Sequence, residues 1–433
     1  MAAKAPSSTR RTLIASLVGT GIECYDFNIY TTAAALVFGE LFFPKASHPV
    51  QQMLSFATIA VAFAARPLGS IFFGHFGDRV GRKSTLVVSL LTMGISTTLV
   101  ACLPTYHSAG WIAALMLCVL RFGQGFGLGG EWGGAVLLAV ENAPPGSRAR
   151  YGMFPQLGVP TGFIAANGLF LTLGAILTPE QFQDWGWRIP FALSAMLVGV
   201  GLWIRLKLTE TPQFAASLAE APPPTIPLGE LVTRHFGPLA AGTIGAIVSF
   251  TLYYVATAFA LGYGTKTLGY GMRQFLAVQL AAIPFMVAGI YASARLADLQ
   301  FDERRMLILG CIAAIASGVL LAPLMRSGSL LLVFLFLALA MTSKGMIFGP
   351  LASWLASLFP ARVRYTGVSM AFNVAGVLGG GLTPLVSQTL VVRGGLSLVG
   401  AYCSAAAAMS LVALLFAGRA KGLPISQAVT QPG

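Results

Sequence analysis

The sequence predicts an all-α membrane protein in which twelve transmembrane helices form two six-helix bundles. Three observations lead to this fold class. The chain of 433 residues is 56% hydrophobic and only 9% charged, which is too apolar to cover a water-soluble globule. Apolar runs of about 20 residues, the length that crosses a bilayer core, recur twelve times. One proline-rich stretch divides these runs into two sets of six.

The predicted helices follow one another through most of the chain. Their expected ranges are residues 12–38, 51–75, 84–103, 110–140, 150–177, 187–206, 237–262, 273–295, 305–323, 329–357, 364–391 and 396–418. Most of the 27 lysines and arginines lie in alternate connections and in the termini, which the positive-inside rule assigns to the cytoplasm. We therefore expect a multi-pass protein of the cell's inner membrane with both termini in the cytoplasm. The net charge of +13 reports this topology, and no nucleic-acid partner is expected.

The chain is expected to contain two halves joined by a linker. Prolines are dense in residues 207–236, and this density breaks transmembrane helices. We therefore assign residues 1–206 to an N-terminal bundle, 207–236 to a cytoplasmic linker and 237–433 to a C-terminal bundle with a short cytoplasmic tail. An internal repeat supports this division, because RARYG at 148–152 and RVRYTG at 362–367 open the fifth and eleventh helices.

Several classes of chemistry are excluded by what the sequence lacks. The five cysteines lie in separate apolar segments without a CxxC pair, which argues against a disulfide framework or a zinc site. Seven glycines in residues 123–134 superficially match GxGxxG, but no preceding strand or βαβ unit would hold a nucleotide. The sequence shows no nucleophile triad or metal-ligand constellation. We expect no metal, no cofactor and no enzymatic reaction.

Charged residues inside apolar runs identify the candidate functional sites, because each costs at least about 2.5 kcal/mol on insertion scales. Glu23 and Asp26 lie on one face of the first helix, with Tyr30 one turn further. Two carboxylates placed close together can share a proton. We expect Asp26 to be the main proton carrier, supported by Glu23. Alternatively, one or both are permanent ion-pair partners that orient Arg121 or Arg66.

The fourth helix places Arg121, Gln124 and Glu131 along one stripe. Arginine stays charged and can bind a carboxylate with two hydrogen bonds, so Arg121 is a candidate for both proton coupling and substrate binding. Glu131 lies about 15 Å further along the helix, toward the cytoplasmic end. It serves either as a proton exit point or as a structural partner of a loop cation.

Lys344 is the only mid-membrane cation of the second half. No acid lies near it in the sequence, so we expect it to bind the carboxylate of a substrate. In the alternative, its side chain extends along the helix toward the polar end.

Other polar side chains at membrane depth are weaker candidates for substrate contacts. These candidates are Tyr25, Tyr30, Gln124, Gln156, Tyr253, Tyr254 and Asn373. Gln156 has a structural alternative as a hydrogen bond between helices, and the tyrosines have one as packing or interface residues.

A short basic loop at residues 74–83 (GHFGDRVGRK) lies between the second and third helices, and its glycines suit a cytoplasmic hinge. It resembles the G-x-x-x-D-R-x-G-R-[RK] signature of the major facilitator superfamily. Three further stretches resemble the metabolite:proton symporter branch, which contains permeases for shikimate, 2-oxoglutarate, citrate and proline/betaine. These stretches are residues 23–27 (ECYDF), 121–134 (RFGQGFGLGGEWGG) and 185–191 (WGWRIPF).

The resemblance implies a fold, an activity and roles for particular residues. It implies two bundles around a midplane cavity, and inward symport of a small organic anion with protons. Across the superfamily an acid on the first helix faces an arginine on the fourth, which matches Asp26 and Arg121. The loop residues Asp78, Arg79, Arg82 and Lys83 are expected to gate the cytoplasmic side, with Glu141 and Glu210 as candidate partners.

Three other functions remain open on the sequence alone. They are a zwitterion or betaine/proline symporter, a proton-driven exporter of drugs or metabolites, and a membrane receptor or scaffold that binds a ligand without transporting it. Ser357 stands where relatives carry a glutamate before Leu358-Phe359-Pro360, which predicts an altered cytoplasmic gate in the second half. We expect a monomer whose partners are the small organic anion, protons and the lipid bilayer.

Overall fold

The computed structural model describes residues 7–80, 82–207, 227–299, 301–360 and 363–417, and within these ranges the regular structure is helical. The long helices of the N-terminal half are α1 (Ser7–Leu36), α3 (His48–Val80), α4 (Arg82–Val100), α6 (Trp111–Leu128) continued by α7 (Glu131–Glu141), α8 (Arg148–Ile176) and α10 (Ile189–Lys207). Four short elements connect them: α2 (Phe38–Phe42), α5 (Tyr106–Ala109), α9 (Pro179–Asp184) and the 3₁₀ turn η1 (Gly186–Arg188).

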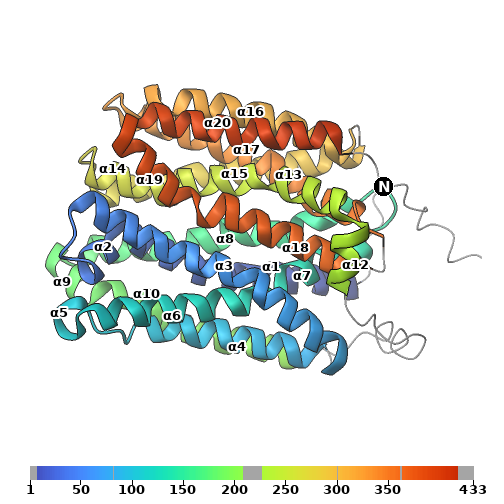
Figure 1. Cartoon of the computed structure of the whole chain (residues 1–433), viewed down its shortest axis with the longest axis horizontal. Coiled ribbons are helices and arrows are strands. Elements are labelled where there is room, and N and C mark those ends of the chain that lie inside the picture. The colour runs from blue at the N-terminus through green and yellow to red at the C-terminus, as the bar shows by residue number, and fades with distance from the viewer. Residues whose placement is uncertain (1–6, 81, 208–226, 300, 361–362, 418–433) are drawn as a thin grey trace, which may run out of the picture.

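The C-terminal half repeats this plan. Its helices are α13 (Phe236–Tyr254) continued by the π-helical η2 (Val255–Phe259) and α14 (Ala260–Lys266), α15 (Met272–Leu299), α16 (Glu303–Met325), α17 (Leu330–Ser357), α18 (Arg364–Gly376) continued by the π-helical η4 (Val377–Gly381) and α19 (Thr383–Gly394), and α20 (Leu396–Phe416). Figure 1 shows the N-terminal helices in blue to green below the C-terminal helices in yellow to red.

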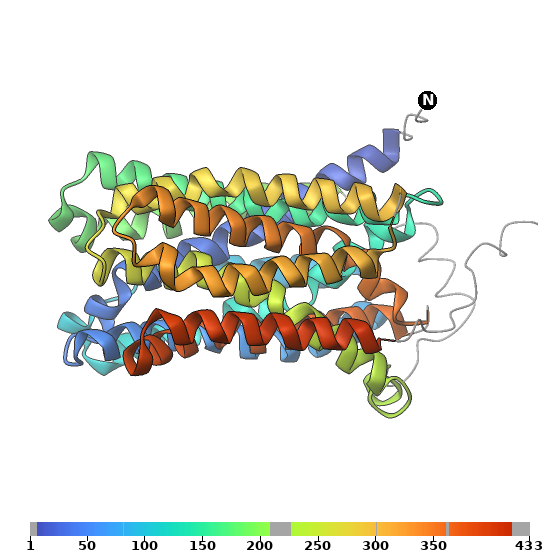
Figure 2. The ribbon, with the colours of Figure 1, turned by 90° about the horizontal axis from the view of Figure 1, so that it is seen from above.

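Ten of these helices or continued helices are long and apolar enough to cross a bilayer. The other two helices that the sequence predicts are α1, which carries Glu23 and Asp26, and α4, whose apolar part is Val87–Val100. All twelve run along the long axis of the molecule, with α12 (Pro227–Arg234) and the first residues of α1 at one end (Figure 2). We call this the α12 end, and the opposite end, which carries α9, the α9 end.

One local prediction is corrected. The stretch at 74–83, predicted as a short loop, is mostly helical, because α3 continues to Val80 and α4 begins at Arg82. Its side chains, including those of Asp78, Arg79, Arg82 and Lys83, lie outside what the structure describes. Within the predicted linker, Pro227 begins the helix α12, because proline is tolerated at the first helical position. Residues 208–226, which include Glu210, are outside the described ranges.

Small residues let helices of the N-terminal half pack closely. A Cβ atom built on Gly125 of α6 would lie 1.9 Å from the carbonyl oxygen of Ala62 in α3. Close approach of this kind replaces the hydrophobic driving force that lipid removes. It sets α3 firmly against α6, so the polar side chains of both helices have defined positions.

Candidate functional site

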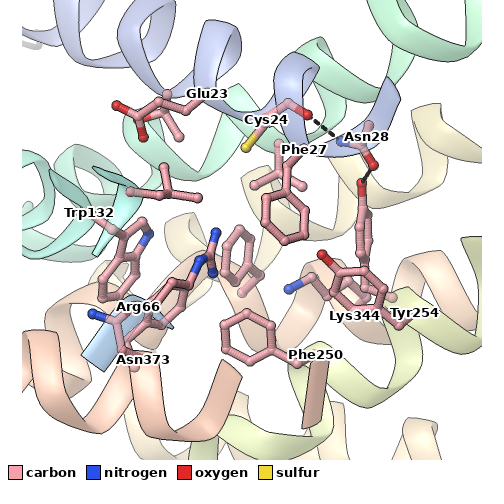
Figure 3. A pocket seen from close by; sticks show the side chains of 16 residues that line it. Glu23, Cys24, Phe27, Asn28, Arg66, Trp132, Phe250, Tyr254, Lys344 and Asn373 are labelled. Carbon is pink, nitrogen blue, oxygen red and sulfur yellow. Dashed lines mark hydrogen bonds between the residues drawn. The ribbon is translucent and has the colours of Figure 1, made fainter. Parts of the chain in front are cut away.

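A central cavity lies between the two halves at the middle of the helices. Sixteen residues line it, from α1, α3, α6, α7 and α8 of the N-terminal half and from α13, α17 and α18 of the C-terminal half (Figure 3). Its volume is about 80 Å³. Because both halves supply the lining, a movement of one half against the other changes the site directly.

Two cations and one carboxylate reach this cavity: Arg66 from α3, Lys344 from α17 and Glu23 from α1. Figure 3 shows the guanidinium group of Arg66 and the ammonium group of Lys344 pointing toward its middle. Among the residues that the structure describes, neither cation forms an ion pair with a carboxylate. The cavity therefore offers positive charge to a ligand.

Aromatic rings hold both cations. The Arg66 guanidinium carbon lies 4.7 Å from the ring centroid of Phe27 and 4.6 Å from that of Phe63. The Lys344 nitrogen lies 3.5 Å from the ring centroid of Phe348 and donates a hydrogen bond of 2.6 Å to Ser249 Oγ. Lys344 is only 3% exposed, so it points into the cavity instead of reaching along its helix to a polar end.

Polar and aromatic side chains close the cavity toward both ends. Toward the α9 end, Tyr253 donates a hydrogen bond of 2.8 Å to Asn28 Oδ1 across the two halves. Toward the α12 end, the rings of Trp132 and Phe372 stack with centroids 3.3 Å apart. The Asn373 amide donates to the Gly129 carbonyl oxygen at 2.9 Å. Of the predicted substrate contacts, Tyr253, Tyr254, Lys344 and Asn373 line the cavity.

Gln156 lies behind this lining and links the two halves. Its amide nitrogen donates to the Phe348 carbonyl oxygen at 3.2 Å, and its oxygen accepts from Trp132 Nε1 at 3.3 Å. The side chain is fully buried. In this geometry it has the interhelical role that the sequence left open.

Asp26 and Arg121 occupy a second buried cluster, which lies inside the N-terminal half and does not line the cavity. Asp26 Oδ1 accepts a hydrogen bond of 2.6 Å from Ser194, and its Oδ2 has no hydrogen-bond partner among the described residues. Arg121 Nη1 donates to Gln124 Oε1. The Gln124 amide in turn donates to the Asp26 carbonyl oxygen at 3.1 Å.

The expected Asp26–Arg121 ion pair is therefore absent from the described part of this conformation. The Arg121 side chain donates to Gln124 instead, and its guanidinium carbon lies 3.6 Å from the Tyr30 ring centroid. We call this set, Asp26, Arg121, Gln124 and Ser194, the Asp26 cluster. How the first and fourth helices are rotated about their axes decides which of their side chains meet, and the residue types alone do not specify this.

The remaining predicted residues have structural contacts elsewhere in the N-terminal half. Tyr25 donates to the Pro190 carbonyl oxygen at 2.9 Å, and Tyr30 donates to Thr58 Oγ1 at 2.6 Å. Glu131 accepts from Ser89 at 2.6 Å.

Ion pairs join the halves at both ends. At the α12 end, Arg150 pairs with Asp298 at 3.0 Å. At the same end, Arg364 of the C-terminal half pairs with Glu141 of the N-terminal half at 3.2 Å. At the α9 end, Lys266 pairs with Glu40 at 2.8 Å. The two halves thus touch on both sides of the cavity.

Arg66 lines the cavity, although the sequence predicts for it only a role as the partner of an acid of the first helix. Like Lys344, it is a cation inside an apolar run, and the structure places both side chains in one cavity. Asn28 was missed altogether, because a lone asparagine in an apolar helix carries no spacing signal.

Comparisons with known proteins agree with this architecture. The family described as "Sugar (and other) transporter" matches residues 12–221. The chain is 46% identical over 413 residues to the inner membrane metabolite transport protein YhjE of Escherichia coli strain K12, covering 94% of each chain. This chain belongs to the major facilitator superfamily.

Other members of the superfamily are also similar to this facilitator. The shikimate transporter of Escherichia coli strain K12 is 37% identical, covering 89% of this chain and 88% of that one. The proline/betaine transporter of Salmonella typhimurium strain LT2 is 31% identical, covering 88% and 78%. The solved proton:xylose symporter XylE shares the fold, with a TM-score of 0.74 at 16% identity over 94% of both chains. The chain is thus a multi-pass transporter and not an enzyme.

Proposed function

We propose that this facilitator is a proton-coupled symporter that imports a small organic acid across the inner membrane by alternating access. The observation that carries the proposal is the pairing of Arg66 and Lys344 in one cavity, one from each half. Buried cations are costly unless an anion neutralises them. A substrate carboxylate is the matching ligand.

The remaining lining favours an organic body attached to that carboxylate. The rings of Phe27, Phe250, Phe348 and Tyr254 supply apolar surface, and Asn28 and Asn373 supply amide groups for hydroxyl or keto oxygens. A ligand held between Arg66 and Lys344 bridges the two halves. Its binding therefore favours conformations in which the halves approach each other.

Proton coupling is assigned to the acids of α1, with Asp26 as the main carrier and Glu23 in support. Asp26 is fully buried in the Asp26 cluster, where Gln124 links its carbonyl oxygen to the side chain of Arg121, a candidate counter-ion. Protonation removes a buried charge and so changes which orientation of the halves is stable. We assign the α12 end to the cytoplasm, with both termini there, and treat the transporter as a monomer.

The relatives support this substrate class and also provide its main alternative. A shikimate transporter at 37% identity carries an organic acid by name, and proline/betaine transporters at about 31% carry zwitterions. In a zwitterion symporter, Glu23 and the aromatic rings would hold the amine. Two cations against one carboxylate in the cavity favour the acid.

The test is uptake into proteoliposomes with an imposed pH gradient, acidic outside, and without one. The panel contains aromatic and alicyclic monocarboxylates, dicarboxylates, hydroxy acids and betaines. We expect gradient-driven accumulation of an acid and none of betaine. Accumulation of betaine alone, or outward movement of the cargo against the proton gradient, contradicts the proposal. The Asp26→Asn variant should exchange substrate but not concentrate it, and full concentrative uptake would remove Asp26 from the mechanism.

A further inference from the structure

Phe27 lies where the central cavity meets the Asp26 cluster. It lines the cavity and is 5% exposed. Its ring centroid is 4.7 Å from the guanidinium carbon of Arg66, which belongs to the cavity. The same centroid is 4.6 Å from the guanidinium carbon of Arg121, which belongs to the cluster. One aromatic ring therefore contacts a cation from each site.

The ring has little freedom to move away from either cation. Phe63 packs edge-on against it at 5.1 Å between centroids, and Tyr254 does so at 6.5 Å. Buried side chains packed on several sides keep one rotamer. The ring therefore stays in place, and a movement of either guanidinium changes its distance from the ring.

Two cations that share one ring attract the ring and repel each other. The face of an aromatic ring attracts a buried guanidinium, and the attraction is stronger where water is excluded. Repulsion between like charges is strong in the same low-dielectric surroundings. An anion bound to Arg66 removes most of that repulsion, because it neutralises one of the two charges.

The Arg121 side chain has an alternative position beside the Asp26 carboxylate. In the described structure its Nε and Nη2 atoms have no hydrogen-bond partner, and neither does Asp26 Oδ2. Gln124 is bonded to both residues, to the Arg121 side chain and to the Asp26 carbonyl oxygen. A shift of Arg121 off the rings of Phe27 and Tyr30 toward Asp26 would satisfy these three atoms together.

We propose that Phe27 is the positioning residue that couples substrate occupancy to protonation of Asp26. The inference rests on the proposed function. With a carboxylate on Arg66, Arg121 stays on the Phe27 ring and Asp26 keeps its proton. When the carboxylate leaves, the charge of Arg66 repels Arg121, which moves to Asp26. Asp26 then gives its proton to water at the open cytoplasmic end, and the resulting carboxylate pairs with Arg121.

The test compares Phe27→Leu, which keeps an apolar side chain but loses the ring, with Phe27→Trp, which keeps a strong cation-binding face. The matched control is Phe250→Leu, because Phe250 lines the same cavity but contacts neither Arg66 nor Arg121 among the cation–ring contacts of the described residues. The readout is the steady-state accumulation ratio of the acid identified by the uptake panel, with counterflow exchange measured on the same proteoliposomes.

Wild type is expected to accumulate a substrate about tenfold per pH unit of gradient if one proton moves with one substrate without net charge. Phe27→Leu should fall toward onefold accumulation while exchange remains measurable. Phe27→Trp should stay close to wild type. Phe250→Leu should need more substrate for half-maximal exchange but reach the wild-type ratio. A wild-type ratio for Phe27→Leu overturns the proposal.

A second measurement keeps the proposal testable if Phe27→Leu reconstitutes poorly. When the acid is added in weakly buffered detergent solution, the wild-type protein should take up a proton, which a pH indicator reports. Phe27→Leu should bind the acid with little proton uptake. Equal uptake by both proteins contradicts the coupling role. If wild type itself neither accumulates the acid on a gradient nor takes up a proton, the proposed function fails and not the role of Phe27.

Discussion

The carboxylate of Asp298, near the end of α15, binds both the backbone and the side chain of Arg150 at the beginning of α8. The Asp298 carboxylate accepts from the backbone N–H groups of Ala149 and Arg150 at 3.0 and 2.9 Å, and from Arg150 Nε at 3.0 Å. A carboxylate at a helix N-terminus meets unsatisfied N–H groups and the positive end of the helix dipole. This contact joins the two halves at the α12 end, whereas Lys266 and Glu40 join them at the α9 end.

Replacing Asp298 by alanine should open the α12 end. Hydrogen bonds to a charged group contribute about 1.5 to 3 kcal/mol each in favourable cases, so the open population should rise at least about tenfold. Cys24 lines the cavity and provides a native reporter. In a background with the other four cysteines changed to serine, we expect faster labelling of Cys24 by a membrane-impermeant thiol reagent from the α12 side.

The matched variant for this prediction is Glu40→Gln, which weakens the ion pair at the α9 end. It should speed labelling of Cys24 from the opposite side of the membrane and leave the α12 side slow. If Asp298→Ala and Glu40→Gln change labelling from the same side, the assignment of two opposed closures is wrong.

Lys344 should contribute strongly to the affinity for the acid. Lys344→Gln keeps a polar side chain of similar length but removes the charge that faces the cavity, so half-saturation should rise by about tenfold to a hundredfold, as expected for a buried ionic contact of roughly 1.5 to 3 kcal/mol. Equilibrium binding of the radiolabelled acid measures this change. Ser249→Ala removes only the hydroxyl that Lys344 contacts and should cost less. Unchanged affinity in Lys344→Gln would exclude the lysine as the anion anchor.

The close approach of α3 and α6 makes Gly125 intolerant of a side chain. A Cβ atom there would lie 1.9 Å from the Ala62 carbonyl oxygen, so Gly125→Ala must push two helices apart. We expect a loss of thermal stability or of folded protein, measured by size-exclusion chromatography after heating. Gly168→Ala is the control, because a Cβ atom on Gly168 meets nothing within 4 Å. That variant should be neutral or slightly stabilising.

Gln279 of α15 stabilises the π-helical turn η2. Its amide nitrogen donates to the carbonyl oxygens of Ala256 and Thr257 at 2.8 and 2.9 Å, across two helices. Gln279→Leu removes both of these buried hydrogen bonds, although the Thr257 carbonyl oxygen still accepts from the Ala260 N–H, and a typical hydrogen bond contributes about 0.5 to 1.5 kcal/mol to stability. The melting temperature in detergent should fall, while Gln274→Leu, which removes only an exposed hydrogen bond of 3.3 Å from the Gly271 N–H, should lower it much less. Equal melting temperatures for the two variants would show that η2 does not depend on Gln279.

The lengths of the long helices were predictable because a bilayer core sets a minimum length for an apolar run that crosses it. The predicted range 329–357 corresponds to α17 (Leu330–Ser357), and 396–418 corresponds to α20 (Leu396–Phe416). The prediction was weakest at 74–83, where hinge-like glycines suggested a loop but α3 continues to Val80. Two helices can be joined within a very short segment, and composition does not reveal how short it is.

The candidate site was predictable in its charges but not in its grouping. Insertion cost marked Glu23, Asp26, Arg121 and Lys344 as residues in need of a partner, and the structure gives partners or a cavity to each. It separates Asp26 and Arg121 from the cavity and brings Arg66 into it. Successive side chains on a helix point about 100° apart, so the rotation of the helix decides which neighbour each one meets. In an apolar sequence the faces of a helix are similar in composition, so the sequence does not reveal this rotation.

The sequence by itself determined that this protein crosses a membrane as two related halves and that it buries charge at mid-depth. Hydrophobicity and the cost of a buried ion are local properties of the chain, so they can be read residue by residue. Only the tertiary structure decided that Arg66 and Lys344 share a cavity, and that Gln124 bonds the Arg121 side chain and the Asp26 carbonyl oxygen. Such neighbours are set by helix rotation and close packing between segments far apart in the chain, which depend on all twelve helices at once.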